Sequence, residues 1–147
     1  MRLVAYAGLV IAAWLVSRFV PIRYRLAVWI LVIAGIVVPW GRLQDHPRWD
    51  RIRWIPLVSP PVRLSDVVGN IALYVPLGMF CAPSRSGRAG VIRAATLALV
   101  LSGLTEATQL FSDGRFPSMG DLAMNVLGAL IGAVAVTRTR QTSSTPV

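Results

Sequence analysis

Five apolar runs, separated by gaps that hold nearly all of the charged residues, are the main pattern of this chain. The runs cover residues 3–17, 26–41, 67–84, 94–112 and 122–137. Each has 15–19 residues, which is near the lower limit for crossing roughly 30 Å of hydrocarbon. A segment in lipid must satisfy its own backbone hydrogen bonds, so each run is expected to be helical. The pattern predicts an all-α, polytopic transmembrane helix bundle with about five spans.

The gaps divide these helices into three regions. Residues 1–64 are predicted to hold two N-terminal spans and a long loop, residues 65–137 a core of three spans, and residues 138–147 a disordered tail. The loop 42–66 mixes Trp with Arg, which is typical of a segment lying on the membrane interface. Ser65 and Ser118 are suited to cap the third and fifth helices. Pro76 is expected to kink the third helix.

The composition agrees with a membrane protein. Hydrophobic residues make up 55% and charged residues 14% of the chain, and the mean hydropathy is +0.64. These values exclude intrinsic disorder and an ordinary soluble domain. All 15 basic residues are Arg, and the net charge is +9. These Arg residues stand between apolar runs, where they act as topological anchors, and no nucleic-acid-binding motif accompanies them. With one Cys and one His, neither a disulfide framework nor a Cys/His zinc site is expected, and no cofactor is predicted.

The distribution of Arg gives an expected orientation. Five spans place eight Arg residues on the side of the C-terminus and seven on the other side. The two short loops on the first side, residues 18–25 and 85–93, contain no acidic residue. Since basic residues in short loops favour the cytoplasm, we expect a multi-pass protein of the bacterial inner membrane. Its N-terminus would be outside and its C-terminus inside.

Polar residues recur at helical spacing in the last three runs, near the ends that share one side of the membrane. The third predicted helix carries Asp66, just before its run, Asn70 and Tyr74. The fourth carries Ser102, Glu106 and Gln109, and the fifth carries Asp121, just before its run, and Asn125. Each set lies on one helix face. Because such faces avoid lipid, we expect them to turn together and form a pocket. The predicted ligand-binding residues are Asn70, Tyr74, Ser102, Glu106, Gln109, Arg115, Asp121 and Asn125.

Simpler roles compete with this interpretation. Asp121 stands three residues after Ser118, which is capping-box spacing. Asn70, Gln109 and Asn125 are also suited to hydrogen bonding between helices. Helix packing is the expected role of Pro76, Gly78, Gly128 and Gly132. Glu106 is the one Glu of the chain and lies within a span, which favours a functional role.

The polar positions and their neighbours resemble the VanZ-like family of small integral membrane proteins. Three motifs carry the resemblance: Asn70-x-x-x-Tyr74-Val75-Pro76-Leu77-Gly78, Ser102-x-x-x-Glu106-x-x-Gln109 and Arg115-x-x-Ser118-x-x-Asp121-x-x-x-Asn125-x-x-Gly128. The family is named for a protein of a glycopeptide-resistance cluster that lowers sensitivity to teicoplanin. The resemblance therefore implies a membrane topology and a link to antibiotic resistance and the cell envelope, but no reaction.

Two functions are compatible with these residues. In the first, which we prefer, the protein is not an enzyme and its pocket binds an envelope lipid, a lipid-linked cell-wall intermediate or a lipoglycopeptide. In the second, it is a membrane-embedded enzyme acting on a lipid head group or glycolipid. Glu106 is then the acid or base, Arg115 an anion clamp and Asp121 a second carboxylate. A transporter or channel is a third possibility and would require a homo-oligomer. Membrane lipids are the expected partners throughout.

Overall fold

The computed structural model of the chain describes residues 2–38, 43–56, 63–82 and 87–141. This part consists of five α-helices and one turn of 3-10 helix, with two isolated β-bridges and no strand. The elements are α1 (Arg2–Ser17), α2 (Ile22–Val37), η1 (Trp49–Arg51), α3 (Leu64–Cys81), α4 (Gly87–Gln109) and α5 (Met119–Gln141). The all-helical class and the number of helices confirm the prediction from hydropathy.

The five helices differ in length. Three described helices are long and apolar enough to cross a membrane: Leu64–Cys81, Gly87–Gln109 and Met119–Arg138. α1 and α2 have 16 residues each, so each is about 24 Å long at 1.5 Å per residue. A hydrocarbon layer of roughly 30 Å must therefore thin, or the helix ends must be extended by snorkelling side chains, around this pair.

Several helix boundaries differ from the predicted ones for local reasons. α2 ends at Val37 because Val38 precedes a proline, and Val38 adopts the extended conformation that this position favours. α4 begins seven residues before the predicted run, at Gly87, whose φ is +46°. At that φ a residue with a side chain would be strained. The helix α5 continues to Gln141, past the predicted boundary at residue 137; residues 142–147 lie outside the described part.

The two predicted N-caps had different outcomes. Ser118 directly precedes α5, and its Oγ accepts a hydrogen bond from the Asp121 N–H at 3.3 Å, which confirms the cap. Ser65 lies inside α3, which begins at Leu64 and has no side-chain cap. The Ser65 hydroxyl instead donates to the neighbouring Asp66 carboxylate at 3.2 Å. The prediction for Ser65 was therefore wrong by two positions.

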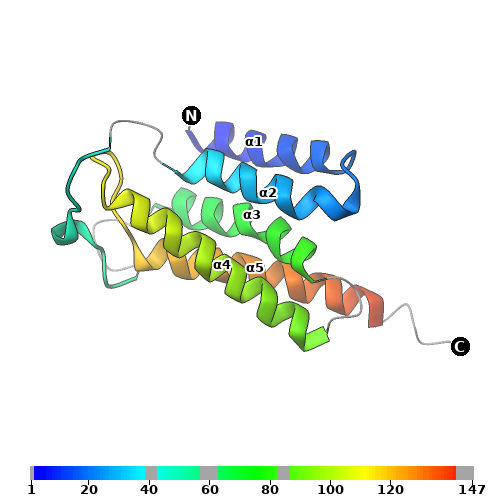
Figure 1. The fold of residues 1–147 in the computed structure, drawn as a ribbon. Helices are drawn as coiled ribbons and strands as arrows, with labels where there is room; N and C mark the ends of the chain where they lie inside the picture. Colours follow the sequence, from blue (N-terminus) through cyan, green and yellow to red (C-terminus); the bar gives the residue numbers. More distant parts are fainter. Residues whose placement is uncertain (1, 39–42, 57–62, 83–86, 142–147) are drawn as a thin grey trace, which may run out of the picture.

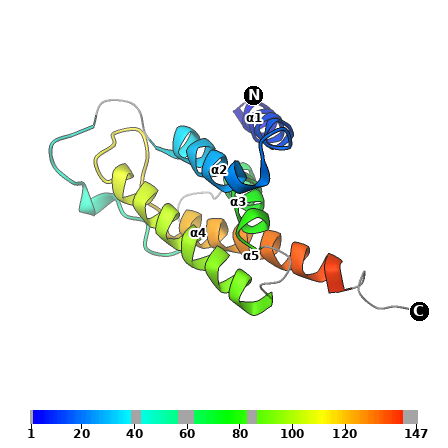
Figure 2. The same cartoon turned by 45° about the vertical axis from the view of Figure 1, so that its right-hand side comes forward.

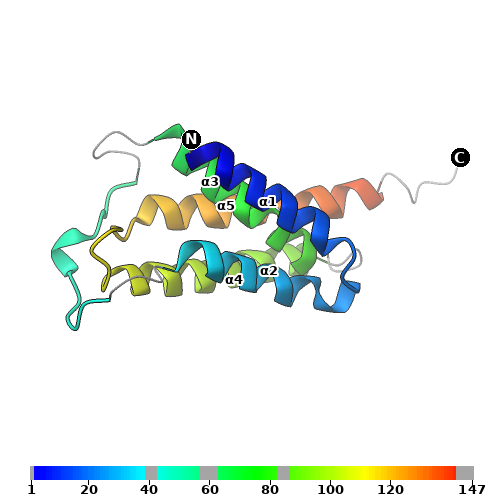
Figure 3. The ribbon, with the colours of Figure 1, turned by 90° about the horizontal axis from the view of Figure 1, so that it is seen from above.

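α3 is the central helix of the bundle and packs against α1, α2, α4 and α5. The α1–α2 hairpin covers one side of it, and α4 and α5 lie on the other side (Figure 1). Seen from above, successive helices run in alternate directions, and the two long loops share the end opposite the C-terminus (Figure 3). The same separation of the loop end from the C-terminus is visible in Figure 2.

Backbone contact between α3 and α5 depends on small residues. A Cβ added at Gly78 would strike the Ala129 carbonyl, and one added at Gly128 would strike the Ile71 carbonyl. Likewise, a Cβ at Gly132 would meet the Val75 carbonyl oxygen. Such close approach is typical of small-residue interfaces between membrane helices.

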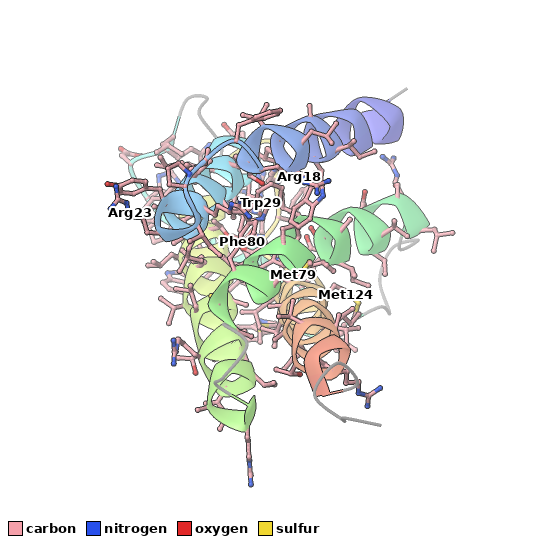
Figure 4. All side chains as sticks on the ribbon, turned by 90° about the vertical axis from the view of Figure 1, so that its right-hand side faces the viewer. Arg18, Arg23, Trp29, Met79, Phe80 and Met124 are labelled. Carbon is pink, nitrogen blue, oxygen red and sulfur yellow. The ribbon has the colours of Figure 1, made fainter. Side chains whose placement is uncertain are left out.

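An indole hydrogen bond joins α2 to α3 where the helix contains Pro76. Trp29 Nε1 donates to the Leu73 carbonyl oxygen at 2.8 Å. Pro76 has no N–H to donate to the carbonyl four residues earlier, that of Ala72, yet α3 runs through this position as one helix. Trp29 also contacts Phe80 edge-on, with ring centroids 6.3 Å apart, and Figure 4 shows both side chains between their helices. The α1–α2 hairpin is thus attached to α3 by aromatic packing and one buried hydrogen bond.

The outer faces of the helices are apolar. Large exposed hydrophobic side chains include Ile11, Leu15, Leu31, Leu99, Leu104 and Ile131. Apolar surface on this scale is covered by lipid in a membrane protein. The end of the bundle that holds the α2–α3 and α4–α5 loops, here called the loop end, is polar in contrast.

The glycine contact predicts a selective loss of stability. Gly132→Ala places a methyl group against the Val75 carbonyl and forces α3 and α5 apart, at a cost of about 1–3 kcal/mol. Gly103→Ala, the matched control in α4, meets nothing within 4 Å and should stabilise the helix by up to about 1 kcal/mol. Unfolding of the detergent-purified variants measures both changes. Equal stabilities would show that the α3–α5 contact is not tight.

Candidate functional site

Two loops far apart in the sequence are joined at one end of the bundle. The loop that follows α2 pairs with the loop between α4 and α5 through two β-bridges, Leu43 with Ser112 and Arg53 with Ser118. The Arg53 N–H donates to the Pro117 carbonyl at 2.8 Å, and the Met119 N–H donates to the Arg53 carbonyl at 3.1 Å. Figure 1 shows the two segments side by side. The first loop is therefore fixed against the start of α5.

Glu106 of α4 also binds the start of α5. Its Oε2 accepts a hydrogen bond from the Ser118 N–H at 2.7 Å, and its side chain is buried, with 9% exposed. In an ordinary capping box this N–H is bound by a carboxylate three residues further along the same helix. Here the carboxylate comes from a neighbouring helix. The spacing of Ser118 and Asp121 had suggested Asp121 for this role, and the structure assigns it to Glu106.

A buried polar cluster lies between α3, α4 and α5. Asn125 Nδ2 donates to Ser102 Oγ at 2.9 Å, and both side chains are buried. Tyr74 is fully buried beside Ser102 and Thr105. Within the described residues, the Tyr74 hydroxyl and Asn125 Oδ1 have no hydrogen-bond partner. This cluster joins the three core helices where a polar group facing lipid would be costly.

A cavity of about 330 Å³ lies at the loop end. It is bounded by the end of α2, the start of α3, the end of α4, the start of α5 and both loops. The lining residues are Val37, Arg53, Arg63, Ser65, Asp66, Gly69, Asn70, Leu73, Gln109, Arg115, Phe116 and Asp121. Charged, amide and apolar groups thus share one space.

The cavity contains charges of both signs. Arg53 lies over the Phe116 ring, with its guanidinium carbon 5.1 Å from the centroid. Arg63 immediately precedes α3, whose N-terminus has no side-chain cap. Arg115 is close enough to Glu106 and Asp121 for their charges to interact. The three guanidinium groups and the N-terminus of α3 favour an anion in this cavity, whereas Asp66, in the first turn of α3, and Asp121 add negative charge to it.

The structure divides the predicted pocket residues into two groups. Asn70, Gln109, Arg115 and Asp121 line the cavity, whereas Tyr74, Ser102, Glu106 and Asn125 do not line it. Sequence reasoning omitted Arg53 and Arg63. Arg63 stands three residues before Asp66, so helical spacing offered a signal for it. Arg53 offered none, because its loop reaches the cavity only by pairing with a distant segment.

A comparison with known families decides where the chain belongs. The VanZ/LLP1 family model matches residues 10–140. The chain belongs to the VanZ/LLP1 family. Searches of curated proteins and of solved structures found no match. In this VanZ/LLP1 chain, no three His, Cys, Asp or Glu side chains of the described residues cluster so as to hold a metal ion.

The cap predicts different effects for two substitutions of Glu106. Glu106→Ala leaves the Ser118 N–H without its acceptor and should cost about 1–3 kcal/mol. Glu106→Gln keeps a carbonyl oxygen for this N–H and should stay within about 1 kcal/mol of the wild type. Hydrogen–deuterium exchange at Ser118 and Met119 should accelerate in the alanine variant alone. Unchanged exchange in that variant would mean that the carboxylate does not hold the start of α5.

Proposed function

We propose that this VanZ/LLP1 membrane protein is a non-enzymatic binder of an amphiphilic ligand. The ligand class comprises envelope lipids, lipid-linked cell-wall intermediates and lipoglycopeptides. Its polar group occupies the cavity at the loop end, while its acyl chain lies along the bundle. The observation that carries this proposal is the cavity itself, with Arg53, Arg63 and Arg115 around one space at the ends of the membrane helices.

The lining suits an amphiphile. The volume of the cavity, about 330 Å³, is at the lower end of the range for small-molecule sites. Val37, Leu73 and Phe116 give it apolar walls, and two amides, Asn70 and Gln109, provide neutral hydrogen bonds. Membrane helices end at the level of the lipid headgroups. A cavity at those ends is therefore placed to receive a headgroup.

The position of Glu106 favours binding over catalysis. An enzyme acting through this carboxylate would require it to reach the ligand. Glu106 does not line the cavity, and its Oε2 is occupied by the Ser118 N–H. Its geometry instead supports a role in holding the start of α5. A link to teicoplanin sensitivity would then arise from binding of the drug or of its lipid-linked target.

Loss of cavity arginines should weaken lipid binding. Arg53→Ala and Arg63→Ala each remove a charged donor, which should weaken binding of phosphatidylglycerol vesicles about tenfold or more. The Arg53 backbone hydrogen bonds persist in its alanine variant, so the loop stays paired. Arg88→Ala, at the opposite end of α4, is the matched control and should bind like the wild type. Microscale thermophoresis of the full-length protein measures the affinities.

The same assay separates binding from catalysis. Glu106→Gln should keep wild-type affinity within a few-fold, because the cap survives. Equal affinities of the Arg53, Arg63 and Arg88 variants would contradict the proposed function. Lipid turnover by the wild type that Glu106→Gln abolishes would establish the enzyme instead.

We propose a bacterial inner-membrane location with the N-terminus and the cavity on the outer side. Gly114 is exposed in the loop between α4 and α5, and the native Cys81 is buried. Gly114→Cys should therefore react with a membrane-impermeant maleimide added to intact cells. Arg88→Cys, at the other end of α4, should react only after the cells are opened. The reverse labelling pattern would place the cavity in the cytoplasm.

A further inference from the structure

Guanidinium and carboxylate groups line the same cavity at the loop end. In the part of the chain that the structure describes, neither Arg53 nor Arg63 forms an ion pair with a carboxylate. Both nevertheless line the same space as Asp66 and Asp121. Arg53 and Arg115 lie close enough to Asp121 for their charges to interact.

The two cavity carboxylates, Asp66 and Asp121, are close enough for their charges to interact. Asp121 of α5 lies near Asp66 and interacts with the Asn70 side chain, both of α3. Asp66 and Asn70 are one helical turn apart and share a face of α3. Their carboxylate and amide oxygens accept hydrogen bonds. These side chains therefore suit a group that donates hydrogen bonds or carries a positive charge.

The arginines suit the opposite kind of group. A guanidinium presents planar paired donors that match phosphate oxygens. Arg63 also stands at the N-terminus of α3, which lacks a side-chain cap; the dipole at that end attracts anions. A ligand that carries both an anionic group and a hydrogen-bond donor matches both kinds of side chain in this cavity.

We propose that the cavity selects a lipid headgroup in which a phosphate adjoins a hydrogen-bond donor. The phosphate binds Arg53, Arg63 and Arg115, and the donor binds Asp66 and Asp121. A primary ammonium and the hydroxyl groups of a phosphate-linked sugar both satisfy this rule. A trimethylated ammonium, which has charge but no N–H, does not. This inference rests on the proposed function and adds the headgroup chemistry to it.

Two lipids with identical acyl chains provide the direct test. Phosphatidylethanolamine and phosphatidylcholine carry the same phosphate and the same net charge, but only the first has N–H donors. The full-length protein should bind phosphatidylethanolamine about tenfold or more tightly. A polyprenyl diphosphate sugar is the third probe. Whichever of the two donor-bearing lipids binds more tightly identifies the source of the headgroup.

Paired variants assign the two halves of the site. Asp66→Asn combined with Asp121→Asn should abolish the preference for phosphatidylethanolamine while phosphatidylcholine binding persists. Arg53→Ala should weaken the binding of both lipids. Asp50→Asn, in η1 and outside the cavity, is the control for the aspartate variants and should keep the preference.

The outcomes separate this inference from the proposed function. Equal binding of the two lipids by the wild type, still weakened by Arg53→Ala, overturns the headgroup rule and leaves lipid binding intact. A preference that survives the double aspartate substitution overturns it as well. Binding that no cavity arginine affects overturns both.

Discussion

The arrangement of the loop end depends on one hydrogen bond, from the Ser118 backbone to the buried Glu106 carboxylate. It attaches the start of α5 to the end of α4. The neighbouring backbone groups of Pro117 and Met119 then bind Arg53. A carboxylate inside a membrane protein is costly unless it is bonded, so this contact both satisfies Glu106 and fixes the segment that carries a cavity arginine.

Close packing in the middle of the bundle determines what meets at its end. Because α3 and α5 touch through Gly78, Gly128 and Gly132, their first turns also lie close together. Asp66 and Asn70 on α3 are thereby brought near Asp121 on α5. Small residues about two to three turns away thus hold polar groups around one cavity. In this way packing, rather than a local motif, creates the site.

Much of the fold could be predicted from the sequence because lipid imposes simple rules on an apolar run. The helical class followed from the five runs, and the cap at Ser118 followed from local propensity. The end of α2 and the start of α4 were misplaced because a hydropathy pattern does not register the conformational effect of a proline or of a glycine with positive φ. The 16-residue lengths of α1 and α2 agree with the short first and second runs.

The site was less predictable, for a different reason. Helical spacing placed Asn70, Gln109 and Asp121 on faces that meet, and all three line the cavity. It also placed Tyr74 and Asn125 on those faces, but the depth along each helix puts them in a buried cluster instead. Arg53 reaches the cavity through a non-local loop pairing, which no spacing encodes. The partner of Glu106, the Ser118 N–H, stands at the start of another helix, so helical spacing could not indicate this hydrogen bond either.

A crystal structure of the full chain, grown from a lipid mesophase containing phosphatidylethanolamine, would show what occupies the loop-end cavity. We expect a headgroup there, with its phosphate between the guanidinium groups of Arg53 and Arg63. A closed cavity in which those arginines pair with Asp66 and Asp121, with the lipid bound elsewhere, would show that the cavity is not a headgroup site.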